Sequence, residues 1–256
     1  MNKIVLITRA TSGFGKACAE KFSSNGYNLI ITGRREDRIE KIKKELEEKY
    51  SVKVLSLVFD VQNKKAVFDT LQNIPDNWKQ IDVLINNAGL ALGRDFFEEA
   101  ELDDWETMID TNVKGVLYVT RAILPFMIAR KKGHIINLGS VAGKEVYEKG
   151  NVYCASKHAL DAISKSMRID LLRHQIKVTA VHPGAAETEF SLVRFKQNAD
   201  QAKKIYDGYQ PLVAEDIADI IFYCASTPAH VCINDLVVTP VAQANSFYLH
   251  KSAPNA

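Results

Sequence analysis

The sequence predicts one α/β domain over residues 1–256, in which a doubly wound parallel sheet of about seven strands is covered by helices on both faces. Short runs of apolar, β-branched residues alternate with longer helical patterns along the whole chain. Those runs are almost continuously apolar, which is typical of strands that are buried on both faces. The length suits one large domain, and no internal repeat, linker or low-complexity segment divides it.

The elements follow in order from these patterns. The predicted strands are short apolar runs, at residues 4–7, 29–32, 52–58, 81–85, 134–138, 177–181 and 235–238. The predicted helices are amphipathic segments, at residues 13–25, 36–49, 64–71, 104–130, 152–172, 200–206 and 214–224. A lid-like insertion around residues 185–212 follows the sixth strand, and residues 247–256 form a C-terminal tail.

Local signals support three of these helices. Gly26 follows helix 13–25 as a C-terminal cap. The many charges of helix 36–49 are expected to form its solvated face. Pro125 is expected to end or kink the last turn of helix 104–130 because proline disrupts the hydrogen bonding of a helix interior.

Composition excludes several classes of protein. The chain has 33 basic and 31 acidic residues and a net charge of +2, so no broad nucleic-acid surface is expected. Its four cysteines include no CxxC pair and no histidines at zinc spacing, so we expect free thiols in a reducing compartment and no metal site. No signal-peptide core or membrane span is apparent. The expected protein is cytoplasmic and acts on a small molecule.

The turn after the first strand has the composition of a phosphate-binding loop. It opens helix 13–25, where free N–H groups and a positive dipole end face a ligand phosphate. Gly13 and Gly15 allow the backbone to approach a pyrophosphate closely. A P-loop is excluded because residue 17 is Ala rather than Ser or Thr. The residues expected at the cofactor here are Thr8, Arg9, Thr11, Ser12, Gly13, Phe14 and Gly15.

The end of the second strand predicts the kind of dinucleotide. In dinucleotide-binding folds an acidic residue at this place binds the ribose of NAD, whereas arginine accommodates the additional phosphate of NADP. Arg34 and Arg35 stand here, and no acidic residue occurs before Glu36. Guanidinium groups bind phosphate through several donors and a fixed charge. The pattern favours NADP, although a plain basic helix start is the alternative.

The pattern Tyr153-x-x-x-Lys157 predicts an acid/base pair. Four residues of spacing on a helix place both side chains on one face, where an ammonium group lowers the pKa of a phenol by favouring phenolate. Such a tyrosine donates a proton to a carbonyl oxygen or removes one from an alcohol. Ser140, at the end of the fifth strand, is suited to orient the same substrate oxygen. Each signal alone is weak, and the combination is specific.

Together these motifs resemble the classical short-chain dehydrogenase/reductase family, whose members have a Rossmann-type fold. The glycine loop departs from the family's pattern at one position, where Arg9 replaces the first glycine. The resemblance matches Asn112, Ser140, Tyr153 and Lys157 to the family's catalytic tetrad, and it implies that Asn112 helps to hold a water in the proton relay. The further cofactor contacts that it implies are Asp60, Val61, Asn87, Ala88, Gly89, Pro183, Gly184 and Thr188.

Several longer stretches are similar to one branch of that family, the bacterial NADP-dependent 3-hydroxy acid dehydrogenases. That branch includes serine or allo-threonine dehydrogenases and malonic semialdehyde reductases. The stretches are 86–93, 104–112, 188–196 and 228–231. The resemblance implies a small 3-hydroxy acid or 3-oxo acid substrate and a homotetramer.

Three questions stay open from the sequence alone. A reductase of 3-oxoacyl thioesters or of general carbonyl compounds is the alternative within the enzyme class. An NADPH-binding protein whose catalysis is impaired by Arg9 is the alternative from another class. Arg194, in the predicted lid, is a candidate for the substrate's carboxylate, and a solvent-facing lid arginine is the alternative.

Overall fold

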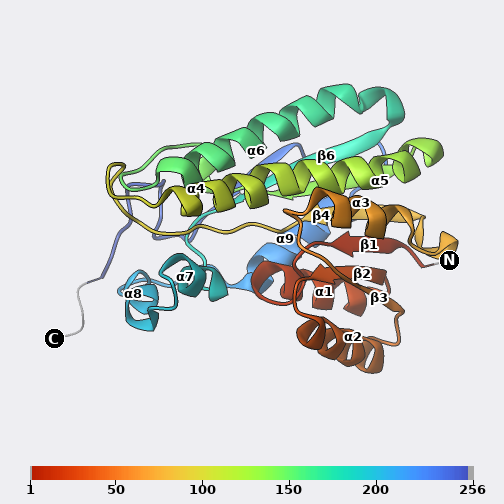
Figure 1. The fold of residues 1–256 in the computed structure, drawn as a ribbon, viewed down its shortest axis with the longest axis horizontal. Helices are drawn as coiled ribbons and strands as arrows, with labels where there is room; N and C mark the ends of the chain where they lie inside the picture. Colours follow the sequence, from red (N-terminus) through yellow and green to blue (C-terminus); the bar gives the residue numbers. More distant parts are fainter. Residues whose placement is uncertain (1, 253–256) are drawn as a thin grey trace.

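The computed structural model describes residues 2–252. These residues contain one seven-stranded sheet with helices packed on it (Figure 1). Its strand order is β3-β2-β1-β4-β5-β6-β7, and every neighbouring pair is parallel. The strands are β1 (Ile4–Ile7), β2 (Asn28–Gly33), β3 (Val54–Val58), β4 (Ile81–Asn86), β5 (Gly133–Leu138), β6 (Ile176–Pro183) and β7 (Asp235–Val238). The predicted fold class is confirmed.

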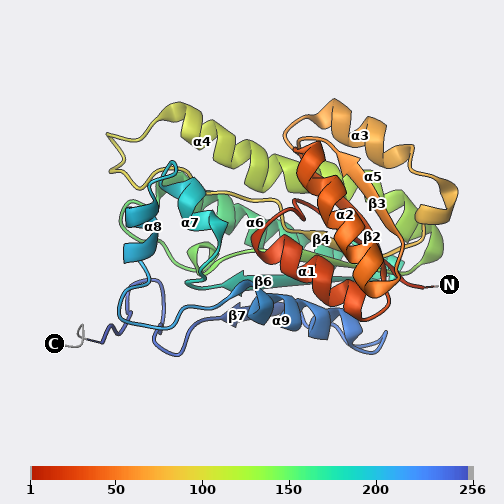
Figure 2. The ribbon, with the colours of Figure 1, turned by 90° about the horizontal axis from the view of Figure 1, so that it is seen from below.

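Helices cover both faces of the sheet. This arrangement is required because the strands carry apolar side chains on both faces. One face carries α1 (Gly13–Ser24), α2 (Glu36–Tyr50) and α9 (Ala214–Ser226). The other carries α3 (Lys64–Gln72), α5 (Val116–Arg130) and α6 (Asn151–Asp170), and Figures 1 and 2 show the two layers on opposite sides of the strands. The alternate residues of β1 divide between two cores, with Val5 and Ile7 in one and Ile4 and Leu6 in the other.

The long helix predicted at 104–130 differs from its expected form. It begins as α4 (Leu102–Ile109), widens into a π-helical turn (Asp110–Gly115) and continues as α5 through Pro125 to Arg130. The irregularity therefore lies at the π turn, and the helix does not end at Pro125. At the π turn Gly115 packs against Val61 so closely that a Cβ atom on it would lie 2.9 Å from Val61 Cγ2.

The helix Leu102–Arg130 is long and apolar enough to cross a membrane by length and composition alone. In this fold, however, it covers one face of the sheet. Val119, Ile123 and Met127 are fully buried in the core between helix and strands.

The segment after β6 contains one helix that the sequence analysis did not predict. It is α7 (Glu189–Arg194), whose first turn is capped by Thr188 because the Thr188 hydroxyl accepts a hydrogen bond from the Phe190 N–H at 3.2 Å. The short helix α8 (Ala199–Lys204) follows, close to the predicted 200–206. Both helices lie beyond one end of the strands (Figure 2), where ligands of such folds bind.

Candidate active site

A pocket opens at the carboxyl ends of the strands, between the sheet and helix α7. Its wall contains residues from the glycine loop, from the ends of β4, β5 and β6, from α6 and from α7. Thirteen of the residues singled out from the sequence lie in it: Arg9, Ser12, Gly13, Phe14, Asn87, Gly89, Ser140, Tyr153, Lys157, Pro183, Gly184, Thr188 and Arg194. The fold therefore gathers residues that are far apart in the chain.

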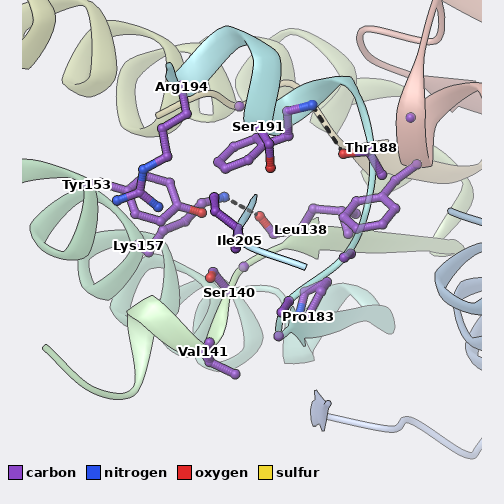
Figure 3. A pocket seen from close by; sticks show the side chains of 18 of the residues that line it. Leu138, Ser140, Val141, Tyr153, Lys157, Pro183, Thr188, Ser191, Arg194 and Ile205 are labelled. Atoms are coloured by element: carbon purple, nitrogen blue, oxygen red, sulfur yellow. Dashed lines mark hydrogen bonds between the residues drawn. The ribbon is translucent and has the colours of Figure 1, made fainter. Parts of the chain in front are cut away.

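Ser140 and Tyr153 approach each other inside this pocket. Ser140 follows β5, and its hydroxyl lies near enough to the Tyr153 hydroxyl to lower the pKa of that phenol. Tyr153 lies in the first turn of α6 and is 7% exposed. Figure 3 shows both hydroxyl groups directed into the same space. A substrate oxygen placed there is within reach of an orienting hydroxyl and of a proton donor or acceptor.

Burial raises the pKa of Tyr153 above its ordinary value, and the neighbouring Tyr147 raises it further. The nearby Ser140 hydroxyl and the positive charge of Arg194 act in the opposite direction. In the absence of a dinucleotide Tyr153 is therefore a protonated phenol at neutral pH. That form is the one required to donate a proton to a carbonyl oxygen.

Lys157 lies one turn beyond Tyr153 on the same helix, and burial lowers its pKa to about 8. Its Nζ donates a hydrogen bond of 2.8 Å to the carbonyl oxygen of Leu138 and lies 6.0 Å from the centre of the Tyr153 ring. The nearer guanidinium of Arg194 has its Cζ 5.5 Å from that centre. Arg194 lowers the Tyr153 pKa, whereas the lowering by Lys157 that the sequence predicts stays a prediction.

Asn112 lies behind the pocket, in the π turn, and is 1% exposed. Its amide group is fully engaged, because it accepts from Leu90 N–H and donates to Leu90 C=O, both at 2.8 Å. The amide also donates to the Ser156 hydroxyl at 3.0 Å. The side chain thus fixes the loop after β4 against α6, and support for a proton relay by Asn112 stays a prediction.

The glycine loop is held to the end of β4 by Thr8 and Asn87. The buried Thr8 hydroxyl accepts from the N–H groups of Asn87 and Ala88, both at 2.9 Å. The Asn87 amide donates back to the carbonyl oxygens of Thr8 and Arg9. A Cβ atom on Gly15 would collide with both Asn87 Nδ2 and the Arg9 carbonyl, so only glycine fits there.

Arg9 adopts a backbone conformation that favours glycine. Its φ is +52°, in the left-handed region, which explains why the family's pattern has glycine at this position. Its guanidinium donates a hydrogen bond to the carbonyl oxygen of Gly89 and so crosses the pocket from the glycine loop to the loop after β4. Burial and the charge of Arg34 lower the Arg9 pKa.

Arg34 and Arg35 lie at the end of β2, next to the glycine loop. Arg34 is largely exposed, and its Nη1 lies 3.4 Å from Asp60 Oδ2. A Cβ atom on the neighbouring Gly33 would lie 3.0 Å from Thr11, so that threonine packs beside the same strand end. Arg38 follows in α2 and lies 3.9 Å from Glu189 of α7. These arginines form a positive rim beside the pocket.

Pro183, Gly184 and Thr188 form the floor and far wall of the pocket after β6. Gln243 packs so closely on Gly184 that a Cβ atom there would collide with Gln243 Oε1, and that oxygen accepts from Ala185 N–H at 2.8 Å. Sequence reasoning missed Gln243 because no local pattern connects it with β6.

Tyr147 and Arg94 are further wall residues that the sequence analysis missed. Arg194 Cζ lies 5.7 Å from the centre of the Tyr147 ring, and burial raises the Tyr147 pKa. Among the described residues the buried Nε of Arg194 has no hydrogen-bond partner. Figure 3 shows Arg194 extending from α7 over Tyr153. The site therefore contains a buried cationic donor without a hydrogen-bond partner beside the Ser140–Tyr153 pair.

The chain is similar to known dehydrogenases and reductases over most of its length. Residues 3–199 match the family model described as short chain dehydrogenase. The NADP-dependent 3-hydroxy acid dehydrogenase YdfG of Salmonella typhi is 46% identical over 242 residues, which cover 94% of this chain and 96% of that protein. Sulfoacetaldehyde reductase 2 of Chromohalobacter salexigens is 45% identical over 249 residues, covering 97% and 98%.

A solved structure described as the closed form of serine dehydrogenase complexed with NADP+ has a TM-score of 0.90 and 42% identity. It covers 97% of this chain and 100% of its own. The fold, the placement of Ser140, Tyr153 and Lys157, and these similarities agree with one another. The chain belongs to the short chain dehydrogenase family.

Proposed function

We propose that this protein is an NADP-dependent oxidoreductase that interconverts a small 3-hydroxy acid and the corresponding 3-oxo acid. The observation that carries the proposal is the position of Arg194 over Tyr153, because it places a cation beside the two hydroxyls that bind the reacting oxygen. The relatives named for 3-hydroxy acids and for a sulfonated aldehyde support an acidic group in the substrate.

The residues of the pocket fit a dinucleotide. Gly13 has a φ of +50° at the start of α1, which presents backbone N–H groups without a side chain in the way. Arg34 and Arg35 lie where an adenosine phosphate is expected. Lys157 and Thr188 line the opposite end. When bound, the dinucleotide supplies or accepts a hydride.

The chain's own residues supply the remaining chemistry. Ser140 orients the substrate oxygen, and Tyr153 donates a proton to it during reduction or removes one during oxidation. Lys157 and Arg194 favour the phenolate form electrostatically. Reduction of acetoacetyl thioesters, in preference to 3-oxo acids, would instead support the alternative thioester reductase. A panel of both substrate classes, with NADPH and with NADH, distinguishes them.

Replacing Arg34 and Arg35 with alanine is expected to lower the ratio of kcat/KM for NADPH to that for NADH by about 10- to 100-fold. Each charged hydrogen bond contributes about 1.5–3 kcal/mol, and exposure to solvent reduces that amount here. Steady-state kinetics with both cofactors measure the ratio. Arg121→Ala, a change to an exposed arginine of α5, is the control. An unchanged ratio in the double variant would remove the two arginines from cofactor selection.

Arg194→Leu is expected to raise KM for a 3-hydroxy acid by about 10- to 100-fold, since it removes a charged hydrogen bond to the substrate's carboxylate. KM for an uncharged alcohol should stay the same. Lys196→Met is the matched control, because Lys196 lies just after α7 and its Nζ forms an ion pair with Asp104 at 2.9 Å, outside the pocket. Equal effects of Arg194→Leu on both substrates would show that Arg194 does not bind the carboxylate.

We further propose a cytoplasmic homotetramer. The free cysteines agree with a reducing compartment. Several large apolar side chains are exposed on or beside helices α4 and α6: Leu102 is 66% exposed, and Ile169 and Leu172 are 75% exposed each. Exposed apolar side chains of this kind favour a contact with another subunit that would bury them. Light scattering on the purified protein tests the assembly, and a monomer in solution would contradict it.

A further inference from the structure

Four titratable side chains lie together behind the turn that carries Ser140. Lys144 follows that turn, Asp161 belongs to α6, His182 to β6 and Asp235 to β7. Lys144 Nζ lies 2.9 Å from Asp161 Oδ1 and 2.7 Å from Asp235 Oδ2, so one ammonium bridges two carboxylates. We call these four residues the Lys144 cluster.

His182 connects the cluster to Ser140. Its ring is fully buried, and Nδ1 lies 3.2 Å from the carbonyl oxygen of Ser140. A carbonyl oxygen only accepts, so Nδ1 carries the proton and a neutral ring directs the lone pair of Nε2 away from Ser140. That lone pair faces Asp161 at 3.6 Å and Asp235 at 3.5 Å, and Nε2 has no hydrogen-bond partner among the described residues.

The Ser140 turn has no space in which to move independently of these contacts. A Cβ atom on Gly139 would collide with the His182 ring. On the other side, a Cβ atom on Gly143 would lie 2.7 Å from the carbonyl oxygen of Lys157. The turn is therefore held between the His182 ring and the backbone of α6, and movement of the ring away from Ser140 removes the packing and the hydrogen bond that hold the turn on one side.

Asp161, His182 and Asp235 also have the donor atoms of a metal site. The Lys144 ammonium, however, already lies between both carboxylates at hydrogen-bond distance. A divalent cation at the same place would be repelled by it and would have to displace it. The cluster is therefore better described as an internal ion bridge than as a metal site.

We propose that Lys144 is a positioning residue, whose ammonium neutralises Asp161 and Asp235 and thereby keeps His182 neutral and Ser140 in its catalytic place. This inference rests on the proposed function of Ser140. The charged groups that face His182 are Lys144, Asp161 and Asp235, each from a different element. Lys144 is thus connected to the reaction through His182 without touching the substrate.

Burial and the charge of Lys144 lower the His182 pKa, whereas Asp235 and Asp161 raise it. Removal of Lys144 takes away one lowering contribution, deprives Asp235 of its ammonium partner and leaves Asp161 paired with Lys165 alone, so the His182 pKa rises. A protonated Nε2 is attracted to these carboxylates and draws the ring away from Ser140. Activity is then present above the raised pKa and is lost as the pH falls through it.

The test compares Lys144→Met with Lys165→Met. Lys165 is a matched control because its Nζ lies 2.7 Å from the other oxygen of Asp161, on the solvent side of α6, and its side chain is 57% exposed. For Lys144→Met we expect kcat to fall by about 10- to 100-fold, the size of effect typical of a misplaced catalytic group. NADPH affinity, measured by fluorescence titration, should stay unchanged, and Lys144→Arg should restore most of the activity.

The acid limb of the kcat profile should move to higher pH in Lys144→Met and not in Lys165→Met. Adding His182→Asn to Lys144→Met should abolish this shift, since asparagine retains a donor for the Ser140 carbonyl and has no group that titrates. Equal kcat values and equal pH profiles for the two lysine variants would overturn the proposal.

Hydrogen exchange of the peptide covering residues 139–144 provides a measurement that needs no turnover. It should become faster in Lys144→Met than in Lys165→Met, because the turn loses its ion bridge to α6 and β7. If no carbonyl substrate is turned over by the natural protein, the proposed function fails while this comparison still decides the positioning role. Equal exchange in both variants would overturn it.

Discussion

Tyr153→Phe is expected to reduce turnover by about 10²–10⁴-fold, the usual contribution of a positioned acid or base. The change removes only the hydroxyl group. The ring, which packs against Phe190 with centroids 5.8 Å apart and beneath the Arg194 guanidinium, stays in place. NADPH binding should therefore be nearly unchanged. The measurement pairs steady-state kcat with a fluorescence titration of NADPH.

Tyr118→Phe serves as its control, because Tyr118 is a partly buried tyrosine of α5 that packs in the core away from the pocket. It removes the same atom without touching Ser140 or Lys157. Retention of most activity in Tyr153→Phe would exclude Tyr153 as the acid/base. Equal losses in both variants would attribute the effect to folding.

Arg9→Gly is expected to increase NADPH affinity by about 10- to 100-fold. A bound dinucleotide must pass the place where the Arg9 guanidinium crosses to the Gly89 carbonyl, so binding breaks a charged hydrogen bond of about 1.5–3 kcal/mol. Attraction between the guanidinium and phosphate opposes this effect, and salt screens it. Titration of NADPH at fixed ionic strength measures the difference.

A second variant, Arg9→Ala, separates the side chain from the backbone. Both variants remove the guanidinium and should bind NADPH more tightly. A positive φ costs about 1–2 kcal/mol for a residue with a Cβ atom, and only Arg9→Gly removes that atom. Arg9→Gly should therefore increase the free energy of unfolding, whereas Arg9→Ala should not. Equal or weaker NADPH affinity in both variants would show that Arg9 contributes to cofactor binding.

The sequence was sufficient to predict the sheet because its strands are nearly uniform in apolar, β-branched residues. It did not reveal the π turn at Asp110–Gly115, since helical spacing continues on both sides of it. The turn depends on the close packing of Gly115 against Val61, a contact between distant segments. The helix α7 was missed because it is short and its cap, Thr188, had already been interpreted as a cofactor contact.

The site residues could be predicted where reactive side chains stand at a fixed spacing within one element or at the end of a strand. Tyr153 and Lys157 lie one helical turn apart, and Ser140 lies at a strand end, so topology brings all three together. The sequence showed only that Arg9 stands where the family has glycine. Its contact with Gly89 joins two distant segments, so it became visible only in the tertiary structure. Tyr147 and Gln243 belong to loops without periodicity, so no local pattern marks them.

Transfer of deuterium from NADPH that carries two deuterium atoms at C4 of the nicotinamide measures hydride transfer to the substrate directly. The protein would be incubated with the labelled cofactor and malonic semialdehyde, and the product would be analysed by mass spectrometry. The expected product is a 3-hydroxy acid that carries deuterium on the carbinol carbon, and Tyr153→Phe should abolish the transfer. A product without that deuterium, or no product although NADPH is bound, would contradict it.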